Sequence, residues 1–160
     1  EHFESLKIVF CRRSIRLAGY DYARPGFYFV TICSARRVPL FCTITGGRTC
    51  LLPAGRLVAL VVDELDSMLP GVTVDCSAIM PDHIHIVFSL GTGARPLTVA
   101  VHRLKSLSTT RYCHAVHAHG WPRFRRRLWQ RDYYESIIRD APHLAAVRRY
   151  VALNPARWRG

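Results

Sequence analysis

The chain has few acidic residues for its size and no long apolar run. Asp and Glu number 11 against 23 Lys and Arg, so the 160 residues carry a formal net charge of +12. This shortage of negative charge predicts a polyanionic partner, above all a nucleic acid. The alternative, which we favour less, is a basic surface with no partner. No apolar stretch approaches the roughly 20 residues that cross a bilayer, and residues 1–30 lack the pattern of a secretory signal. We therefore expect a cytoplasmic protein with no membrane partner.

The six cysteines form no C-x-x-C pair, which removes the usual sequence signature of a zinc ribbon or a thiol redox motif. Without a secretory signal, reduced thiols are expected in preference to disulfides. Internal repeats and low-complexity segments are also absent. An apolar content of 49% in a chain of this length predicts a single domain with a hydrophobic core.

The most informative motif is Met80-Pro81-Asp82-His83-Ile84-His85-Ile86-Val87-Phe88. Its alternation predicts a strand in which His83 and His85 project from one face, about 6–7 Å apart, while Ile84 and Ile86 face the core. Two imidazoles on one face suit a shared metal ion. Two hydrogen-bonded structural histidines are the alternative.

Hydrophobic periodicity predicts the order strand, helix, strand, strand, helix, strand, helix. The expected strands are 27–33, 72–80, 83–90 and 133–138, and the expected helices are 53–68, 98–117 and 142–153. This is an α+β, ferredoxin-like β-α-β-β-α-β antiparallel sheet with an appended C-terminal helix. We divide the chain into a basic N-terminal arm, 1–25, and one globular domain, 26–160. The histidine strand should be central, and the last helix would have to cover its histidine face.

Tyr150 and Asn154 are four residues apart and so share one face of the last predicted helix. A tyrosine hydroxyl, with a pKa of roughly 10, is a poor nucleophile unless a metal polarises the bond that it attacks or a nearby cation favours the phenolate. Arg148 or Arg149 could be that cation, and the Asn154 oxygen could complete a metal shell. Taken alone, the pair fits a packing residue and a helix stop at Asn154-Pro155. Together with the histidines, it predicts a nucleophile and a metal ligand.

Four ordered stretches carry a family resemblance. They are Arg12-Arg13-Ser14-Ile15-Arg16-Leu17 with Tyr20-Asp21-Tyr22 and Tyr28-Phe29-Val30-Thr31, then Met80-Pro81-Asp82-His83-Ile84-His85, then Leu128-Trp129-Gln130-Arg131 with Ile138-Arg139-Asp140, and last Tyr150-Val151 with Asn154-Pro155. In these the chain resembles the REP-associated tyrosine transposases, within the class of His-hydrophobic-His single-tyrosine nucleases and transposases.

The resemblance implies a bacterial, nucleoid-associated enzyme that cleaves and rejoins single-stranded DNA beside a palindromic hairpin. It implies Tyr150 as the nucleophile, a 5′-phosphotyrosine intermediate and a free 3′-OH. It also implies His83, His85 and Asn154 as ligands of Mg²⁺ or Mn²⁺, with the imidazoles favouring Mn²⁺. The oligomeric state, monomer or homodimer, stays open.

Arginine predominates among the candidate DNA contacts, because its planar fork matches phosphate oxygens. The arm residues could read bases at the foot of the hairpin, and the others could position the backbone. The candidates are Arg12, Arg13, Arg16, Arg103, Lys105, Arg123, Arg125, Arg126, Arg127, Arg148 and Arg149. For Trp129, packing and base stacking are equally plausible. Tyr133 and Tyr134 alternate across a strand, and they rival Tyr150 only if the last helix does not reach the histidines.

Two other functions remain open at this point. The first is a non-catalytic nucleic-acid-binding module, since a ferredoxin-like sheet with exposed aromatics resembles an RNA-recognition domain. The second is a small hydrolase that uses metal-activated water. Such a hydrolase needs carboxylates near the metal, whereas strand alternation predicts that Asp82 points away from both imidazoles.

Overall fold

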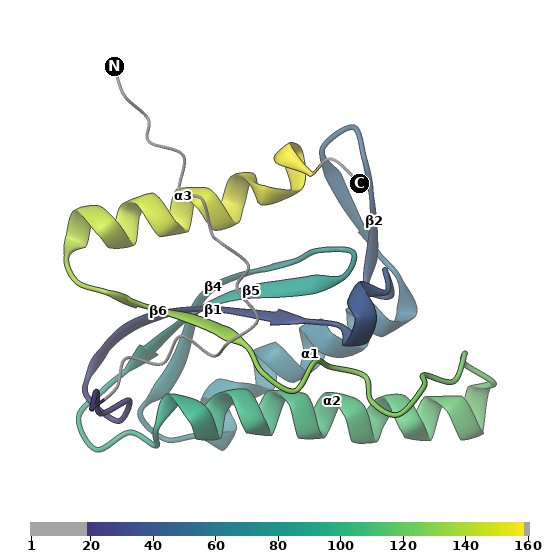
Figure 1. Cartoon of the computed structure of the whole chain (residues 1–160), viewed down its shortest axis with the longest axis horizontal. Helices are drawn as coiled ribbons and strands as arrows, with labels where there is room; N and C mark the ends of the chain where they lie inside the picture. Colours follow the sequence, from purple (N-terminus) through teal and green to yellow (C-terminus); the bar gives the residue numbers. More distant parts are fainter. Residues whose placement is uncertain (1–18, 159–160) are drawn as a thin grey trace.

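The structure is a computed structural model that describes residues 19–158, so the predicted arginines Arg12, Arg13 and Arg16 lie outside the described residues. A four-stranded antiparallel sheet has the strand order β4-β5-β1-β6. Its strands are β1 (Gly26–Cys33), β4 (Val72–Ile79), β5 (His83–Leu90) and β6 (Tyr134–Ile138). The helices are α1 (Pro53–Met68), α2 (Leu97–His119) and α3 (Ala141–Arg157), with a short 3-10 turn, η1 (Ala35–Arg37). This is the predicted ferredoxin-like fold (Figure 1).

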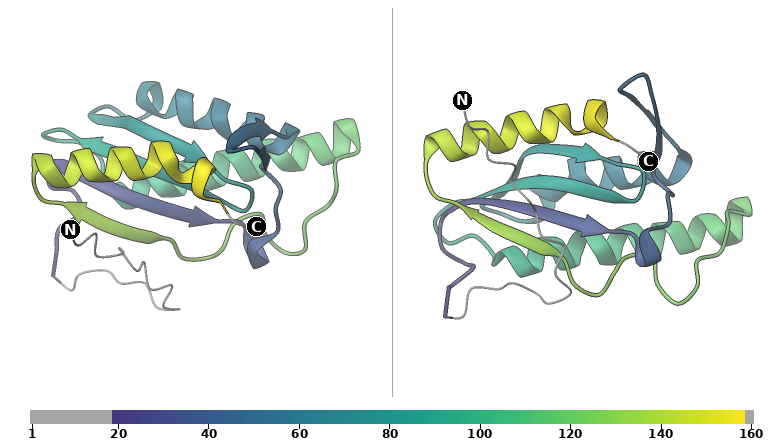
Figure 2. Two further views of the ribbon diagram at one scale, coloured as in Figure 1. Left: turned by 90° about the horizontal axis from the view of Figure 1, so that it is seen from above. Right: turned by 45° about the horizontal axis from the view of Figure 1, so that its top comes forward.

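The sheet lies between two helical layers of unequal size. Helices α1 and α2 cover one face and α3 crosses the other (Figure 1, Figure 2). Ile84, Ile86 and Phe88 of β5 are fully buried in the large core under α1 and α2. Val87, between them, belongs to a smaller apolar cluster under α3. The period-2 alternation of β5 therefore divides its side chains as predicted, with His83 and His85 on the α3 side.

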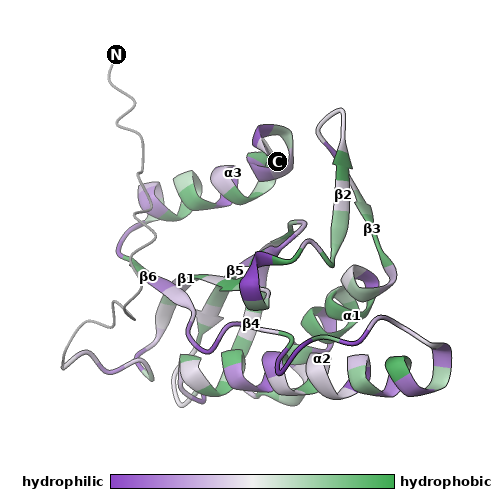
Figure 3. Cartoon of the chain, turned by 45° about the vertical axis from the view of Figure 1, so that its right-hand side comes forward, coloured by the Kyte–Doolittle hydropathy of each residue, from purple (hydrophilic) through white to green (hydrophobic). Residues whose placement is uncertain are grey.

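A second, two-stranded sheet fills the connection between β1 and α1. Strands β2 (Cys42–Thr45) and β3 (Arg48–Leu51) form a hairpin around Gly46 and Gly47, both with positive φ. Figure 3 shows the hairpin standing beside the main sheet, near the C-terminal end of α3. A Cβ on Gly47 would lie 3.3 Å from the Cα of Ala156, which places the hairpin tip against α3.

Most element boundaries agree with the sequence prediction, and the largest difference is at the end of α3. Pro53 begins α1, and the Asp140 side chain caps the N-terminus of α3 by accepting a hydrogen bond from the backbone N–H of His143, 2.8 Å away. The alternative of a helix stop at Asn154-Pro155 is wrong, because α3 continues through Pro155 to Arg157. A proline in the last turn removes only one hydrogen bond, so the helix tolerates it there.

Two expectations about the chain's environment can be compared with the described residues. The five cysteines within 19–158 are free thiols. No helix in that part of the chain is both long enough and apolar enough to cross a membrane.

Gly55 fixes how α1 meets the segment that enters β2. The Phe41 carbonyl accepts a hydrogen bond from the Leu52 N–H at 2.9 Å, and a Cβ on Gly55 would lie only 1.9 Å from that carbonyl oxygen. We expect Gly55→Ala to lower the free energy of unfolding by about 2–3 kcal/mol, because the rigid backbone must move to make room.

Urea denaturation measures this effect, with Leu60→Ala as the control. Leu60 lies on the same helix with 59% of its surface exposed, so its truncation should change stability by no more than about 0.5 kcal/mol. A Gly55→Ala protein as stable as the wild type would contradict the predicted clash.

Candidate active site

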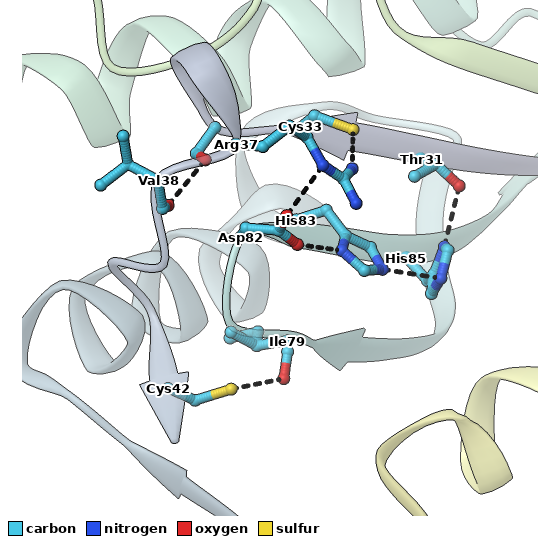
Figure 4. A network of polar contacts seen from close by, with 10 residues as sticks. Thr31, Cys33, Arg37, Val38, Cys42, Ile79, Asp82, His83 and His85 are labelled. Atoms are coloured by element: carbon cyan, nitrogen blue, oxygen red, sulfur yellow. Dashed lines mark hydrogen bonds and ion pairs between the residues drawn. The ribbon is translucent and has the colours of Figure 1, made fainter. Parts of the chain in front are cut away.

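His83 and His85 lie on the central strand β5, on the face that α3 covers. Both are buried, with 6% and 3% of their surface exposed, and their Nε2 atoms are 3.1 Å apart. The register of the neighbouring strand β1 places Cys33 opposite His83 and Thr31 opposite His85. The two buried imidazoles lie side by side, with their Nε2 atoms facing each other (Figure 4).

Each imidazole is held through its Nδ1 atom. His83 Nδ1 donates to Asp82 Oδ1 at 2.7 Å, and His85 Nδ1 is hydrogen bonded to Thr31 Oγ1 at 2.8 Å (Figure 4). Both rings thus direct Nε2, the remaining ring nitrogen, toward the same point. Partners of this kind fix the orientation of metal-binding histidines in proteins.

The prediction that Asp82 points away from the imidazoles is wrong. Strand β5 begins at His83, so Asp82 precedes the region in which alternation dictates side-chain direction. Its second oxygen, Oδ2, is 2.8 Å from Arg37 Nε, and Arg37 Nη1 donates to Cys33 Sγ at 2.7 Å. Both carboxylate oxygens are occupied, so Asp82 holds His83 in place and is poorly suited to activate water. This weakens the hydrolase hypothesis.

Burial keeps both histidines neutral. It lowers the pKa of His85 to about 3, with smaller contributions from the neighbouring His83 and Arg37. Burial also lowers the pKa of His83, although Asp82 opposes that shift. Neutral imidazole is the form that ligates metal ions, so neither ring has to lose a proton first at neutral pH.

Helix α3 brings Tyr150 to the histidines of the same chain. The Tyr150 ring centre is 5.5 Å from that of His85, and the Trp158 ring centre is 5.9 Å from that of His83. Asn154 is half-buried and lies four residues after Tyr150, so the two positions share one face of α3. The structure therefore brings Tyr150 close to His85, whereas the role of Asn154 as a metal ligand stays a prediction.

Two kinds of contact hold α3 in this position. Val147 and Val151 pack with Val87 and Ile138 of the sheet in the smaller apolar cluster. Arg148 forms a two-pronged ion pair with Asp75, in which Nε donates to Oδ2 at 2.8 Å and Nη2 donates to Oδ1. Asp75 sits at a bulge in β4, where the register with β5 shifts.

The predicted DNA contacts occupy several parts of the surface. Arg103, Arg149 and the 123–127 arginines are exposed, whereas Arg148 is engaged with Asp75. Lys105 Nζ donates to the backbone carbonyls of Gln130 and Arg131 at 2.7 and 2.8 Å, which ties α2 to the segment before β6. The contribution of all these residues to DNA binding stays a prediction.

Packing, and not stacking on bases, explains Trp129. The residue is 3% exposed, its ring stacks on Phe41 with centres 4.8 Å apart, and Nε1 donates to Ser108 Oγ at 2.9 Å.

Tyr134, one of the alternative nucleophiles, pairs across the sheet with Thr31, which in turn pairs with His85, so the three residues share one sheet face. Tyr150 nevertheless reaches the histidines directly, and Tyr134 stands two strands away from them.

Sequence reasoning missed Thr31, Arg37 and Trp158 as neighbours of the histidines. The strand register would have indicated Thr31, but no local signal indicated Arg37 or Trp158. Within residues 19–158, no group of three His, Cys, Asp or Glu side chains is placed to hold a metal ion. A third protein ligand for the histidine pair would therefore have to be of another type, such as an amide.

Comparison with known proteins places this arrangement in a family. Residues 70–154, which include the histidine motif and Tyr150, match the family model described as transposase, IS200-like. An uncharacterised protein of Haemophilus influenzae is 31% identical over 161 residues, covering 92% of this chain and 89% of that protein.

Two solved structures share the fold. A REP-associated tyrosine transposase bound to a REP hairpin superposes with a TM-score of 0.64 at 18% identity, over 89% of this chain and 73% of that one. A Deinococcus radiodurans protein described as a candidate transposase gives a TM-score of 0.54 at 16% identity, over 88% of this chain and 96% of that one. The family match spans more than half of the chain and agrees with the resemblance seen in the sequence, so the protein belongs to the IS200-like transposase family.

Proposed function

We propose that this transposase is a metal-dependent endonuclease and strand transferase of the His-hydrophobic-His single-tyrosine type, acting on single-stranded DNA beside palindromic hairpins. The observation that carries the proposal is the position of Tyr150, 5.5 Å between ring centres from His85 in the same chain. A non-catalytic binding module has no need to place a tyrosine over two buried imidazoles with matched Nδ1 partners.

The histidine pair fits a divalent ion. Two nitrogens that each lie about 2.1 Å from one ion, roughly at right angles, are about 3 Å apart, and the two Nε2 atoms are 3.1 Å apart. His83, His85 and the Asn154 amide oxygen would hold the ion. Mg²⁺ or Mn²⁺ bound there would polarise and orient an oxygen of the scissile phosphate.

The protein residues divide the remaining work. Tyr150 Oη attacks phosphorus, the bond from phosphorus to the 3′ oxygen breaks, and a 5′-phosphotyrosine link forms. The phenol gives up one proton and the 3′ oxygen gains one, so the step needs no net proton source. Phe29 contacts Tyr150 edge-on, with ring centres 5.9 Å apart, and so limits the directions in which the nucleophile can point. Attack by another strand's 3′-OH reverses the step and joins DNA.

The substrate is inferred from charge and from the structural neighbour. The net charge of +12 favours a polyanion, and the transposase of similar fold was solved with a REP hairpin. Because one chain supplies both Tyr150 and the histidines, a monomer is sufficient for cleavage, and a homodimer is not required. We also propose a cytoplasmic, nucleoid-associated location, where chromosomal DNA is found.

Replacing the nucleophile tests the chemistry. We expect wild-type protein incubated with Mn²⁺ and hairpin-bearing single-stranded DNA to give a covalent adduct on a denaturing gel. Tyr150→Phe should bind the same DNA but form no adduct, because phenylalanine has no oxygen to attack phosphorus.

Tyr134→Phe is the matched control, since Tyr134 lies on the same sheet face two strands away, and it should still form the adduct. An adduct with Tyr150→Phe that disappears with Tyr134→Phe would move the nucleophile to β6. DNA cleavage without any adduct in all three proteins would instead indicate hydrolysis by water.

Removing a ligand tests the metal site. We expect His83→Gln or His85→Gln to weaken Mn²⁺ binding by about 100-fold or more, since loss of an outer-sphere partner alone costs about 10–100-fold. Asn154→Ala should weaken Mn²⁺ binding, whereas Asn154→Asp should preserve it. Titration of Mn²⁺ by calorimetry measures these effects without DNA. His102→Gln, an exposed change on α2, is the control and should bind like the wild type.

The pH dependence of Mn²⁺ binding follows from the lowered histidine pKa values. Protons compete with a metal only below the pKa of the ligand, and burial lowers the pKa of His83 and brings that of His85 to about 3. Calorimetric affinity should therefore change by less than about threefold between pH 7.5 and pH 6. Two histidines with ordinary pKa values near 6.5 would lose roughly tenfold over that range, and such a loss would contradict the prediction.

A further inference from the structure

Two adjoining cavities lie outside the histidine and tyrosine site, between η1 and the segment that follows α2. One has a volume of about 560 Å³ and the other about 480 Å³. They share Ala35, Arg36, Arg125 and Arg127 as lining residues, so they form one continuous pocket. The size is that of a small-molecule site.

One half of this pocket is strongly cationic. Its lining consists of Ala35, Arg36, Arg125, Arg126, Arg127, Gln130 and Arg131, with no acidic side chain among these residues. Arg36 and Arg126 also have left-handed backbone conformations, with φ of 60° and 68°. Non-glycine residues rarely adopt this region, and such outliers are often found at ligand sites. The cluster has the chemistry of a phosphate site, because a bound anion would relieve the mutual repulsion of the guanidinium groups.

The other half has an apolar wall. Val38, Leu40 and Phe124 form this wall, beside Arg123 and the shared arginines, and Val38 is 43% exposed although it is a large hydrophobic residue. Figure 3 shows the hydrophilic colour of part of the segment between α2 and β6, which supplies Arg125 and Arg127 to the pocket lining. An apolar wall beside an arginine cluster suits a nucleotide, whose base needs apolar contact and whose phosphates need cations.

The turn η1 connects this pocket with the active site. Arg36 lines the pocket, while the next residue, Arg37, holds Asp82, the partner of His83. The Ala35 N–H donates a hydrogen bond to the Leu128 carbonyl at 2.8 Å, and the Gln130 N–H donates to the Cys33 carbonyl at 2.9 Å. These two backbone hydrogen bonds fix the pocket walls relative to β1. The turn η1 therefore carries both a wall of the pocket and the arginine that supports Asp82 beside His83.

We propose that the pocket binds one unpaired nucleotide of the DNA strand, with the base against Val38, Leu40 and Phe124 and the adjacent phosphates on Arg36, Arg125 and Arg127. The assignment of this strand as the cleaved one rests on the proposed function. Binding of the nucleotide itself requires only that the protein binds single-stranded DNA.

The phosphate half is tested with fluorescently labelled dT12 and anisotropy. Arg36→Asn/Arg125→Gln removes two guanidinium groups, and asparagine tolerates the left-handed backbone at position 36. We expect binding to weaken about tenfold or more and the salt dependence to fall by a slope of about 1–2. The charge-matched control is Arg95→Gln/Arg139→Gln, two exposed residues at the opposite end of the sheet, which should weaken binding by about threefold or less.

The base half is tested with an abasic 12-mer that carries the same charge as dT12. Wild-type protein should prefer dT12 by about fivefold or more, the lower end of what stacking one base contributes. Val38→Glu should abolish this preference, because a carboxylate on the apolar wall excludes the base. Val38→Leu keeps the wall apolar and should keep the preference.

Unchanged dT12 binding by the arginine variant, or an equal dT12 preference in Val38→Glu and Val38→Leu, would overturn the nucleotide pocket. Formation of the Tyr150 adduct is scored separately, with Mn²⁺ and saturating hairpin-bearing single-stranded DNA. Pocket-dependent binding without any adduct would refute the proposed enzyme function and leave the pocket standing. Adduct formation together with binding that does not depend on the pocket would refute the nucleotide pocket and leave the proposed enzyme function standing.

Discussion

The pairing of β1 with β5 is the constraint on which the site depends. Its register places Thr31 beside His85 and Cys33 beside His83, and it turns Ile84 and Ile86 into the core. Because side chains alternate with a period of two, a slip of one residue would bury the imidazoles under α1 and α2 and expose isoleucines to α3. Burying four apolar β5 residues under the large core therefore fixes the histidine geometry as strongly as it fixes the fold.

Helix α3 contributes less to the stability of the fold than α1 and α2 do. The large core involves α1, α2 and the sheet, whereas α3 rests on a cluster whose buried members are Val87, Ile138, Val147 and Val151. The ion pair between Arg148 and Asp75 helps to orient α3 on the sheet. It lies at the surface, where such pairs contribute little to the free energy of unfolding. The proposed nucleophile, Tyr150, is thus carried by an element with a smaller apolar support, and low local stability is common for parts of proteins that must accommodate a substrate.

The sequence predicted what periodicity controls and missed what tertiary geometry controls. Alternation identified the histidine face, and helical spacing paired Tyr150 with Asn154, because both features repeat along one element. The direction of Asp82 was mispredicted since it lies just before its strand, and the Arg37 contact depends on a left-handed turn with no sequence signature. Trp129 was undecided because its partners, Phe41 and Ser108, come from distant elements.

The charges at the site are balanced before any metal binds. Asp82 is paired with Arg37, and both imidazoles are neutral, so the protein offers a divalent ion no uncompensated negative charge in this shell. Asn154 would add an oxygen but no charge. The excess positive charge of the described residues lies mostly on exposed arginines in several parts of the surface. In the proposed function a DNA phosphate therefore supplies the missing negative charge, and metal binding and DNA binding strengthen each other by the same factor. A metal ion held in this way is bound most stably when the scissile phosphate is in place. This requirement limits the binding of the metal ion to unrelated anions.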